Sequence, residues 1–164
     1  MKKEFFRKFF LPALVILAAM SFIVFSRFPQ KDIDIPQGQI EKTIPLSIGQ
    51  KYIRALVART EAEQEQGLGD RDSLPSDEGM LFIFTNPSPI GIWMKDMRFP
   101  LDILWVDETR HVLFIKEDAL PSSYPEIFAP DVASKYVIEV SAGFVKENNI
   151  KIGAEISFSE SVLN

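Results

Sequence analysis

The stretch that decides the fold is "GIWMKDMRFPLDILWVDETR", residues 91–110. It contains two apolar runs of strand character, with Pro100 at the bend between them, and it ends in a turn at "DETR". Four charged residues interrupt these runs: Lys95, Asp96, Arg98 and Asp102. They belong either to the solvated face of a sheet or to a site, and the surrounding sequence bears on that choice.

Asp102 lies in a strand whose two faces are both apolar. Successive side chains of a strand point to opposite faces, so "LDILWV" (101–106) puts Asp102 on one face with Leu104 and Val106. Because the other face is apolar too, Asp102 is expected beside a core. A buried carboxylate needs a cation or several hydrogen-bond donors. Its expected partners are Lys95, Arg98 and Arg71. A cap of the bend after Pro100, a ligand site and catalysis remain the alternatives.

Two other segments supply candidates for a binding site. On the preceding run Trp93, Lys95 and Met97 share one face, and Trp93 is expected in the core rather than as a ligand platform. In "YVIEVSAG" (136–143), Glu139 shares a face with Val137, and the favoured interpretation is a solvent-side or cross-strand charge. The candidate binding residues are Asp102, Lys95, Arg71, Trp93, Glu139 and Tyr124, and no residue is assigned a catalytic role.

Upstream of this stretch the chain predicts a hairpin followed by a short helix. The runs "IEKTIPLSIG" (40–49) and "KYIRALVA" (51–58) are rich in β-branched residues and meet at a turn. "TEAE" then fits a capping box, in which the Thr60 hydroxyl caps the helix and Glu63 reaches back. The helix must be short, because the glycines of "QGLGD" end it. Its acidic residues at 61–65 are expected to face solvent.

The remaining segments predict further short strands. "GMLFIF" (79–84) is a continuous apolar run typical of a strand buried on both faces, and "NPSP" (86–89) is expected to end it. "HVLFIK", "KYVIEVSAG" and "IGAEISF" follow as strands, with "FVKENN" as a short helix or turn. Between them, residues 117–134 contain three prolines and no periodicity, which favours a binding loop, a lid or an edge cover. The fold class is therefore mainly β (α+β): a compact antiparallel barrel or sandwich of short strands with one or two small helices.

Composition limits the possible chemistry. The chain has 164 residues, enough for one domain with a substantial core. It has no cysteine and one histidine, His111, which rules out thiolate metal sites and multi-histidine clusters. It has no phosphate-binding glycine-rich loop, no G-x-S-x-G and no H-E-x-x-H motif. We therefore expect neither a metal nor a cofactor.

The N-terminus predicts a membrane anchor. Residues 9–25, "FFLPALVILAAMSFIVF", carry no charge and follow four basic residues, so residues 1–27 are expected to anchor the chain through a lipid-spanning helix. The positive-inside rule puts the N-terminus in the cytoplasm, making this a single-pass protein of the cytoplasmic membrane with its C-terminal domain outside. A cleaved signal peptide and secretion are the alternative, although a clean A-x-A site is missing.

Removing the anchor makes the remaining chain strongly acidic. Residues 28–164 keep 13 basic and 22 acidic residues, a net charge of −9, against −5 for the whole chain. Such a domain is repelled by nucleic acid, so no nucleic-acid partner is expected. Residues 28–39 read as an extended linker because they are rich in proline and charge. The globular domain is then expected to span residues 40–164.

Four segments resemble one family. "QGLGDRDSLPSDEGMLFIF", "WMKDMRFPLDILWVD", "YVIEVSAG" and "IKIG" are similar, in this order, to the bacterial and archaeal family known as domain of unknown function 192. The resemblance covers roughly residues 48–158 and implies a small, strand-rich, often exported domain, but no reaction. The chain departs from the family pattern at Gly69, where methionine is usual, and at Asp96-Met97, where Asn-Thr is usual.

Two functions of different classes fit the sequence. The first is a membrane-tethered, extracytoplasmic module that does no catalysis and binds a small molecule, a glycan or another envelope protein. The second is an extracytoplasmic carboxylate-dependent hydrolase. A pocket with two close carboxylates, one of strongly raised pKa, would favour the enzyme. A pocket lined by Trp93, Tyr124 and aliphatic side chains with one ion pair would favour the binding module.

Overall fold

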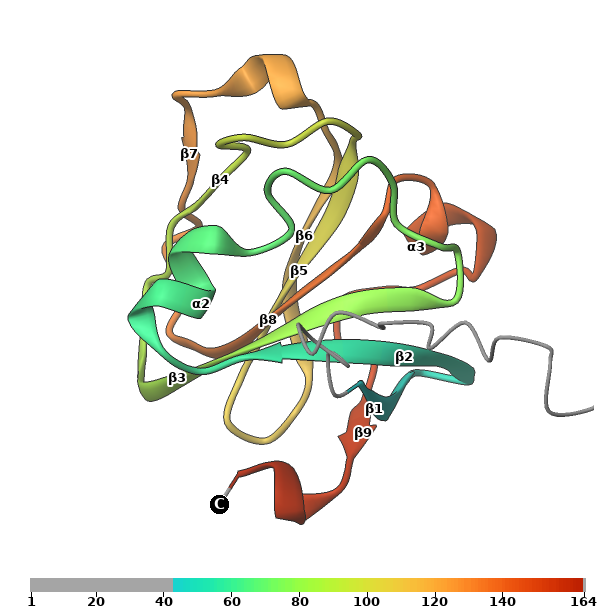
Figure 1. Cartoon of the computed structure of the whole chain (residues 1–164). Coiled ribbons are helices and arrows are strands. Elements are labelled where there is room, and N and C mark those ends of the chain that lie inside the picture. The colour runs from blue at the N-terminus through green and yellow to red at the C-terminus, as the bar shows by residue number, and fades with distance from the viewer. Residues whose placement is uncertain (1–42, 164) are drawn as a thin grey trace, which may run out of the picture. The chain divides into compact units, whose positions relative to one another are not determined.

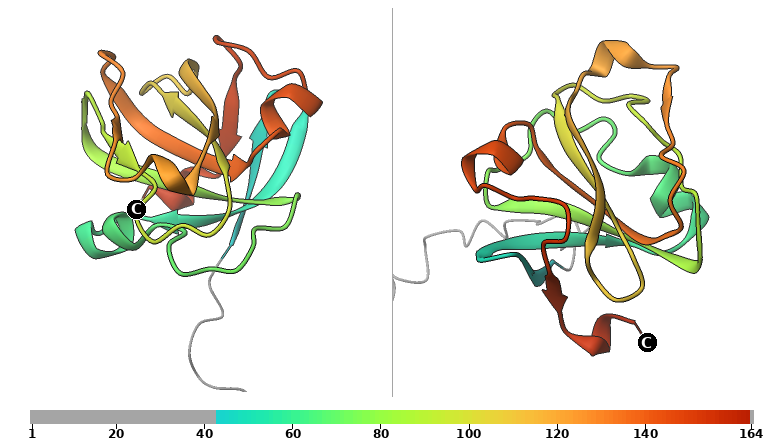
Figure 2. Two further views of the ribbon diagram at one scale, coloured as in Figure 1. Left: turned by 90° about the horizontal axis from the view of Figure 1, so that it is seen from above. Right: turned by 180° about the vertical axis from the view of Figure 1, so that it is seen from behind.

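A computed structural model of the protein describes residues 43–163 and shows a strongly curled, mainly β domain (Figures 1 and 2). Seven strands form one sheet in the order β6-β5-β8-β3-β2-β1-β9. The strands are β1 (Ile44–Ile48), β2 (Lys51–Ala58), β3 (Glu78–Ser88), β5 (Leu101–Val106), β6 (Val112–Ala119), β8 (Ser134–Ser141) and β9 (Ile156–Phe158). The expected mainly β class is confirmed, but the sheet forms a half-barrel that includes one parallel pair, where an antiparallel barrel or sandwich was expected.

The remaining elements are short and cover the sheet. β4 (Ile92–Trp93) and β7 (Ile127–Phe128) pair with each other as a separate two-stranded sheet. Two α-helices, α2 (Glu61–Gln66) and α3 (Phe144–Glu147), and two 3₁₀ turns, η1 (Pro121–Ser123) and η2 (Glu160–Val162), complete the described elements. Within residues 43–163 no helix is long and apolar enough to cross a membrane. The span predicted at residues 9–25 lies outside the described residues.

Neighbouring strands of the large sheet are antiparallel, apart from the parallel pair β2–β3. A parallel pair needs a crossover, and α2 lies within that crossover. The predicted capping box is present: Glu63 N–H donates to the Thr60 hydroxyl, and Thr60 N–H donates to the Glu63 carboxylate. Gly67 ends the helix with a φ of 49°, a conformation that glycine adopts without strain.

The two edges of the curled sheet meet at one end. His111, just before β6, forms an isolated bridge with Glu155, just before β9. Backbone hydrogen bonds from Ile156 N–H to the Arg110 carbonyl and from Val112 N–H to the Ala154 carbonyl extend this contact. The edges are therefore joined there, and elsewhere the sheet remains open.

Both faces of the sheet are covered, which produces two apolar cores. The first fills the concave side and includes Leu46, Leu81, Leu104 and Ile138. The second lies between the other face, α2 and the β4–β7 sheet, and includes Phe82, Ile103, Trp105 and Val137. This arrangement confirms the expectation that strands 79–84 and 101–106 are apolar on both faces; all six residues of β5 are buried.

Two predicted boundaries are wrong. β3 continues to Ser88 instead of ending before "NPSP", and the strand expected at 90–97 is reduced to Ile92–Trp93. The reason at β3 is its irregular register with β8, where pairing skips from Ile83 to Ser88, so no ladder bond is lost at Pro87. The stretch 117–134 is partly ordered as η1 and β7, which cover β4.

Candidate functional site

The site begins with the alternation of side chains along β8. Val137 belongs to the core beneath α2, and Glu139, two residues later, points to the same face. Its cross-strand neighbours are Met80 on β3 and Ile103 on β5. Glu139 is only 5% exposed, so the favoured interpretation of a solvent-side charge is wrong. The mid-sheet position of β8, between β3 and β5, is what buries the carboxyl group.

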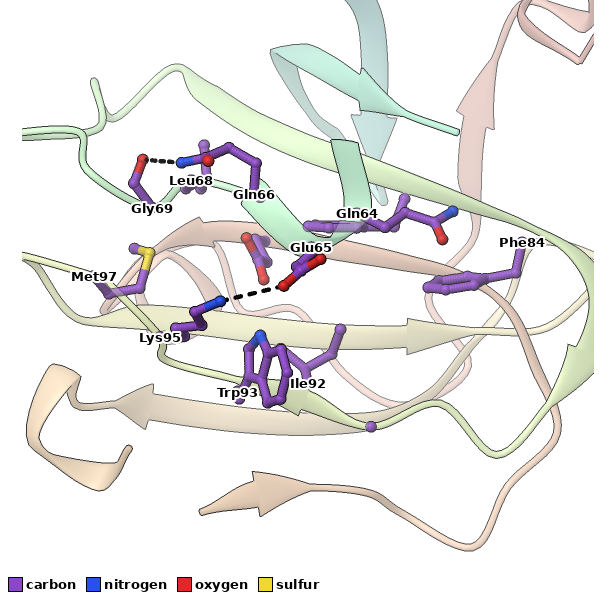
Figure 3. Close-up of a pocket in the computed structure, with 14 residues that line it drawn as sticks. Gln64, Glu65, Gln66, Leu68, Gly69, Phe84, Ile92, Trp93, Lys95 and Met97 are labelled. Atoms are coloured by element: carbon purple, nitrogen blue, oxygen red, sulfur yellow. Dashed lines mark hydrogen bonds and ion pairs between the residues drawn. The ribbon is translucent and has the colours of Figure 1, made fainter. Parts of the chain in front are cut away.

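A pocket of about 200 Å³ opens beside Glu139 (Figure 3). One wall is α2 and the segment that follows it, and another is the segment around β4; Phe82 and Phe84 of β3 contribute aromatic surface. The lining residues are Gln64, Glu65, Gln66, Gly67, Leu68, Gly69, Phe82, Phe84, Gly91, Ile92, Trp93, Lys95, Met97 and Glu139. The pocket thus combines an apolar interior with a few polar groups, as small-molecule sites do.

Backbone hydrogen bonds fix the two walls relative to each other. Asp70 N–H donates to the Asp96 carbonyl at 2.9 Å, directly joining the segment after α2 to the segment after β4. The buried indole N–H of Trp105 donates to the Ile90 carbonyl at 2.8 Å and so holds the chain entering β4 against the sheet. At Gly91 a Cβ would lie 2.6 Å from a methyl carbon of Ile127, so only glycine permits this approach of β7.

Glu139 is the unusual group of the pocket. Its Oε2 atom is buried and has no hydrogen-bond partner among the described residues. Burial alone raises the pKa of Glu139 to about 8, because the charged form loses its hydration. At neutral pH the side chain is therefore mainly a neutral carboxylic acid, which can both donate and accept a hydrogen bond.

An ion pair and two aromatic rings form the rim. Lys95 Nζ lies 3.2 Å from Glu65 Oε1 and 5.7 Å from the centre of the Trp93 ring (Figure 3). The hydrogen bond and charge of Glu65 raise the pKa of Lys95. Trp93 makes an edge-to-face contact with Tyr124, their ring centres 6.4 Å apart. With exposed fractions of 40% and 47%, Trp93 and Tyr124 present aromatic surface to solvent, so the expectation of a core Trp93 is wrong.

Asp102 belongs to a different place. It is fully buried on the opposite face of the sheet, where its two carboxylate oxygens accept the backbone N–H groups of Asp118 and Val145, each at 2.9 Å. Asp118 lies at the register shift between β5 and β6 and has a φ of 52°. Val145 is in the first turn of α3, whose N-cap Gly143 has no side chain to cap it. Asp102 therefore holds a bulge and caps a helix, and it lies outside the pocket.

The expected cationic partners of Asp102 are engaged elsewhere. Lys95 pairs with Glu65, and Arg98 pairs with Asp72 at 2.5 Å and with Asp70 at 3.8 Å. These are contacts of exposed or half-buried side chains. Arg71 is half-buried and does not line the pocket. The expectation that Lys95 or Arg98 neutralises Asp102 is wrong, because backbone amides satisfy both of its oxygens.

The structure thus brings together Trp93, Lys95 and Glu139 as lining residues, with Tyr124 against Trp93, and separates Asp102 and Arg71 from them. Sequence reasoning missed the contribution of α2. Glu65 is exposed, as expected for the acidic helix, yet it also lines the pocket through its pair with Lys95. The sequence showed only that a short helix begins at a capping box and is ended by glycines. Within residues 43–163, no group of three or more His, Asp or Glu side chains could hold a metal ion.

Fold and site together define a class: a small half-barrel domain with a helix-walled pocket and a buried carboxyl group at its side. The chain belongs to the family DUF192, described as "Uncharacterized ACR", whose model matches residues 44–158. This confirms the family that the four sequence segments indicated. No curated protein matches the chain.

Two solved structures are similar to the chain, each with a TM-score of 0.66. One, from Sinorhizobium meliloti 1021, is described as a "putative transcription regulator"; it is 28% identical, and the match covers 71% of this chain and 92% of that one. The other, from Novosphingobium aromaticivorans, is described as a protein of unknown function; it is 31% identical, with 70% and 84% covered.

Proposed function

We propose that this domain is a non-catalytic binding module of the cell envelope and that it takes a small ligand into the pocket beside Glu139. The observation that carries the proposal is the buried Oε2 atom of Glu139, which has no hydrogen-bond partner among the described residues and lines a pocket of mixed polar and apolar side chains. An unsatisfied buried polar atom is costly, and a ligand that satisfies it recovers that cost on binding.

The rim supports a binding role as well. Trp93 lines the pocket with a partly exposed ring that contacts Tyr124, and the pocket has one ion pair, Lys95–Glu65. Exposed aromatic groups beside a concave surface are typical of sites that recognise small molecules. Trp93, the aliphatic lining residues and the single ion pair are the features expected of a binding module.

The setting of this module is also part of the proposal. The uncharged run at residues 9–25, with its basic flank, supports a single-pass anchor in the cytoplasmic membrane, and the linker at 28–39 then holds the domain outside the cytoplasm. Cell fractionation tests this. The full chain is expected in the membrane fraction at full length; a soluble product shortened at its N-terminus would support signal cleavage instead.

A thermal-shift screen of small polar metabolites and short glycans against the purified domain tests the binding role. A ligand that binds only the native state raises the melting temperature. The Glu139→Gln variant should lose most of that response, whereas the matched variant Glu108→Gln, in an exposed turn, should keep it. Equal responses in both variants would show that the ligand binds elsewhere and would contradict the proposal.

One observation favours a hydrolase as the second candidate. Two carboxyl groups, Glu65 and Glu139, line the same pocket, and the pKa of Glu139 is raised to about 8. A carboxylic acid that keeps its proton at neutral pH is suited to general acid catalysis. Turnover of nitrophenyl glycosides or esters that disappears in both Glu139→Gln and Glu65→Gln would favour the enzyme over the binding module.

A further inference from the structure

Two of the three titratable groups that line the pocket are carboxyl groups. Glu139 Oε2 has no partner among the described residues, and Glu65 is a second carboxylate. The side-chain nitrogen of Gln64 donates to the Ile83 and Arg59 carbonyls, and that of Gln66 donates to the Gly69 carbonyl, so both amide groups are held by backbone contacts. We propose that the ligand of this pocket carries a protonated amine, which donates to the Glu139 carboxylate. This inference rests on the proposed binding function.

Charge supports a cationic ligand. Glu65, Lys95 and Glu139 are the only titratable residues among those lining the pocket, and Lys95 already pairs with Glu65. Once Glu139 is ionised, the pocket carries a net charge of −1 that one ammonium group balances. A buried pair of this kind is favourable only if both charges are matched, and an anionic ligand would leave two like charges buried. The acidic balance of residues 28–164 attracts cations from a distance.

The walls indicate the rest of the ligand. Phe82, Phe84, Ile92 and Met97 supply aromatic and aliphatic surface, and Trp93 adds an exposed ring at the rim. A cation near an aromatic face gains further stabilisation, as Lys95 does over Trp93. At about 200 Å³ the pocket is smaller than most drug-sized sites, which favours a short alkylamine or an amine-bearing metabolite of similar size.

In this scheme, binding of the amine is coupled to the release of one proton from Glu139. The free protein holds a proton on Glu139 at neutral pH, the amine arrives already protonated, and the carboxyl proton leaves to solvent as the ion pair forms. The neighbours of Glu139 on β3 and β5 are Met80 and Ile103, which do not titrate, while α2 contributes Glu65 and the segment after β4 contributes Lys95. Affinity should therefore rise by about tenfold for each pH unit between pH 6 and 7 and level off above pH 8.

The experiment uses the full chain in detergent micelles, with n-butylamine as the probe and 1-butanol and butyrate as matched neutral and anionic controls. Calorimetric titration at pH 7 in two buffers of different ionisation enthalpy should give release of about one proton per bound butylamine. Butyrate and butanol should bind at least tenfold more weakly. Binding of butylamine without proton release, or equal binding of butanol, would overturn the inference.

Variants localise the effect. Glu139→Gln should lose at least tenfold in butylamine affinity and all proton release, while Glu108→Gln should match the parent. If Glu139→Gln does not fold, amide chemical shifts of the parent decide: butylamine must perturb residues 64–69 and 91–97, and shifts confined to other residues overturn the inference. A ligand from the thermal-shift screen that needs Glu139 but has no amine would overturn the amine assignment and leave the binding function intact.

Discussion

Asp102 and Glu139 are both buried carboxyl groups of neighbouring strands, and their surroundings give them opposite roles. Asp102 accepts two backbone N–H groups, so its negative charge has donors on both oxygens. Glu139 has an oxygen with no hydrogen-bond partner within residues 43–163, and the pocket lies beside it. Removing the first group should damage the fold, whereas removing the second should affect the site and the pH dependence of stability.

Asp102→Ala is expected to lower the free energy of unfolding by about 2 to 4 kcal/mol. The change leaves the buried N–H of Val145 and the partly buried N–H of Asp118 without acceptors, and a buried unsatisfied group costs about 1 to 3 kcal/mol. Asp102→Asn should cost less, because its remaining carbonyl oxygen still accepts one of them. Urea melts measure both values. An alanine variant that unfolds at the parent's urea midpoint would contradict the structural role.

Glu139→Gln is expected to remove a loss of stability that the parent shows as pH rises from 4.5 to 8. In the folded state the pKa of Glu139 is about 8, against an ordinary value of 4.5, so the folded state binds the extra proton between these values. The stabilising contribution is complete below pH 4.5 and is lost as pH rises toward 8. As pH rises through this window, the parent should therefore lose a few kcal/mol of unfolding free energy that the Glu139→Gln variant does not lose.

Urea melts of the two proteins at pH 5, 7 and 8.5 measure this difference directly, because all other titrating groups are shared. Glu108→Gln serves as the control, since its side chain is exposed. A difference that stays constant from pH 5 to 8.5 would mean that Glu139 ionises normally in the folded protein.

At the residue scale, the sequence correctly predicted which side chains share a face of a strand. It did not predict the groups that these side chains contact. The period of two correctly grouped Asp102 with Leu104 and Glu139 with Val137. The donors to Asp102 come from residues 16 and 43 positions away, at a bulge and a helix start that no local pattern announces. Glu139 was expected near solvent because the local sequence does not show that β8 lies in the middle of the sheet. That position follows from the strand order, which is a property of the whole fold.

At the scale of elements, α2 does more than connect β2 to β3, because three of its residues line the pocket. Gln64 Nε2 reaches the Ile83 carbonyl at 2.9 Å and fastens the helix to β3. The six-residue helix is too short to be stable alone, so its caps and this contact hold it in place.

Thr60→Ala is therefore expected to destabilise the protein by about 1 kcal/mol, because it removes the hydroxyl that caps α2. The same change should loosen the pocket wall, which amide hydrogen exchange detects as faster exchange at residues 63–66 than in the parent. Thr60→Ser keeps the hydroxyl and should behave like the parent. Unchanged exchange in Thr60→Ala would show that the contacts of Gln64 are sufficient.

Element prediction succeeded where the signal was local. The capping box, the glycine stop and the β1–β2 hairpin follow from short patterns and are confirmed. The β4–β7 pair was not predicted, since two-residue strands have no periodicity and their pairing joins segments 35 residues apart. Consequently half of the pocket rim, including the contact of Trp93 with Tyr124, could not be derived from the sequence.

For the whole molecule, the C-terminal segment completes both the sheet and the concave core. β9 pairs with β1, and its Ile156 and Phe158 are buried together with Val162. Residues 153–156 also join the two sheet edges through backbone hydrogen bonds. The domain therefore depends on residues 153–162, which follow all the other strands.

The fragment 39–164 is expected to fold alone as a monomer, because both cores consist of residues within 43–163. The same fragment ending at Lys151 should not fold cooperatively, since it lacks β9 and leaves the edge of β1 unpaired. Circular dichroism and size-exclusion chromatography distinguish the two. A cooperative melt of the shorter fragment would show that β9 is dispensable.

The antiparallel pairing of the first and last strands, with Leu46 opposite Phe158, has a consequence for biosynthesis. A ribosome releases β1 more than 100 residues before β9, so the nascent domain cannot close its sheet until β9 has emerged. Until then the partner edge of β1 is open to other chains, and the domain depends on rapid completion or on chaperones. A circular permutant that links the neighbouring ends and opens the exposed turn at 107–110 would deliver β9 and β1 consecutively and would remove this delay.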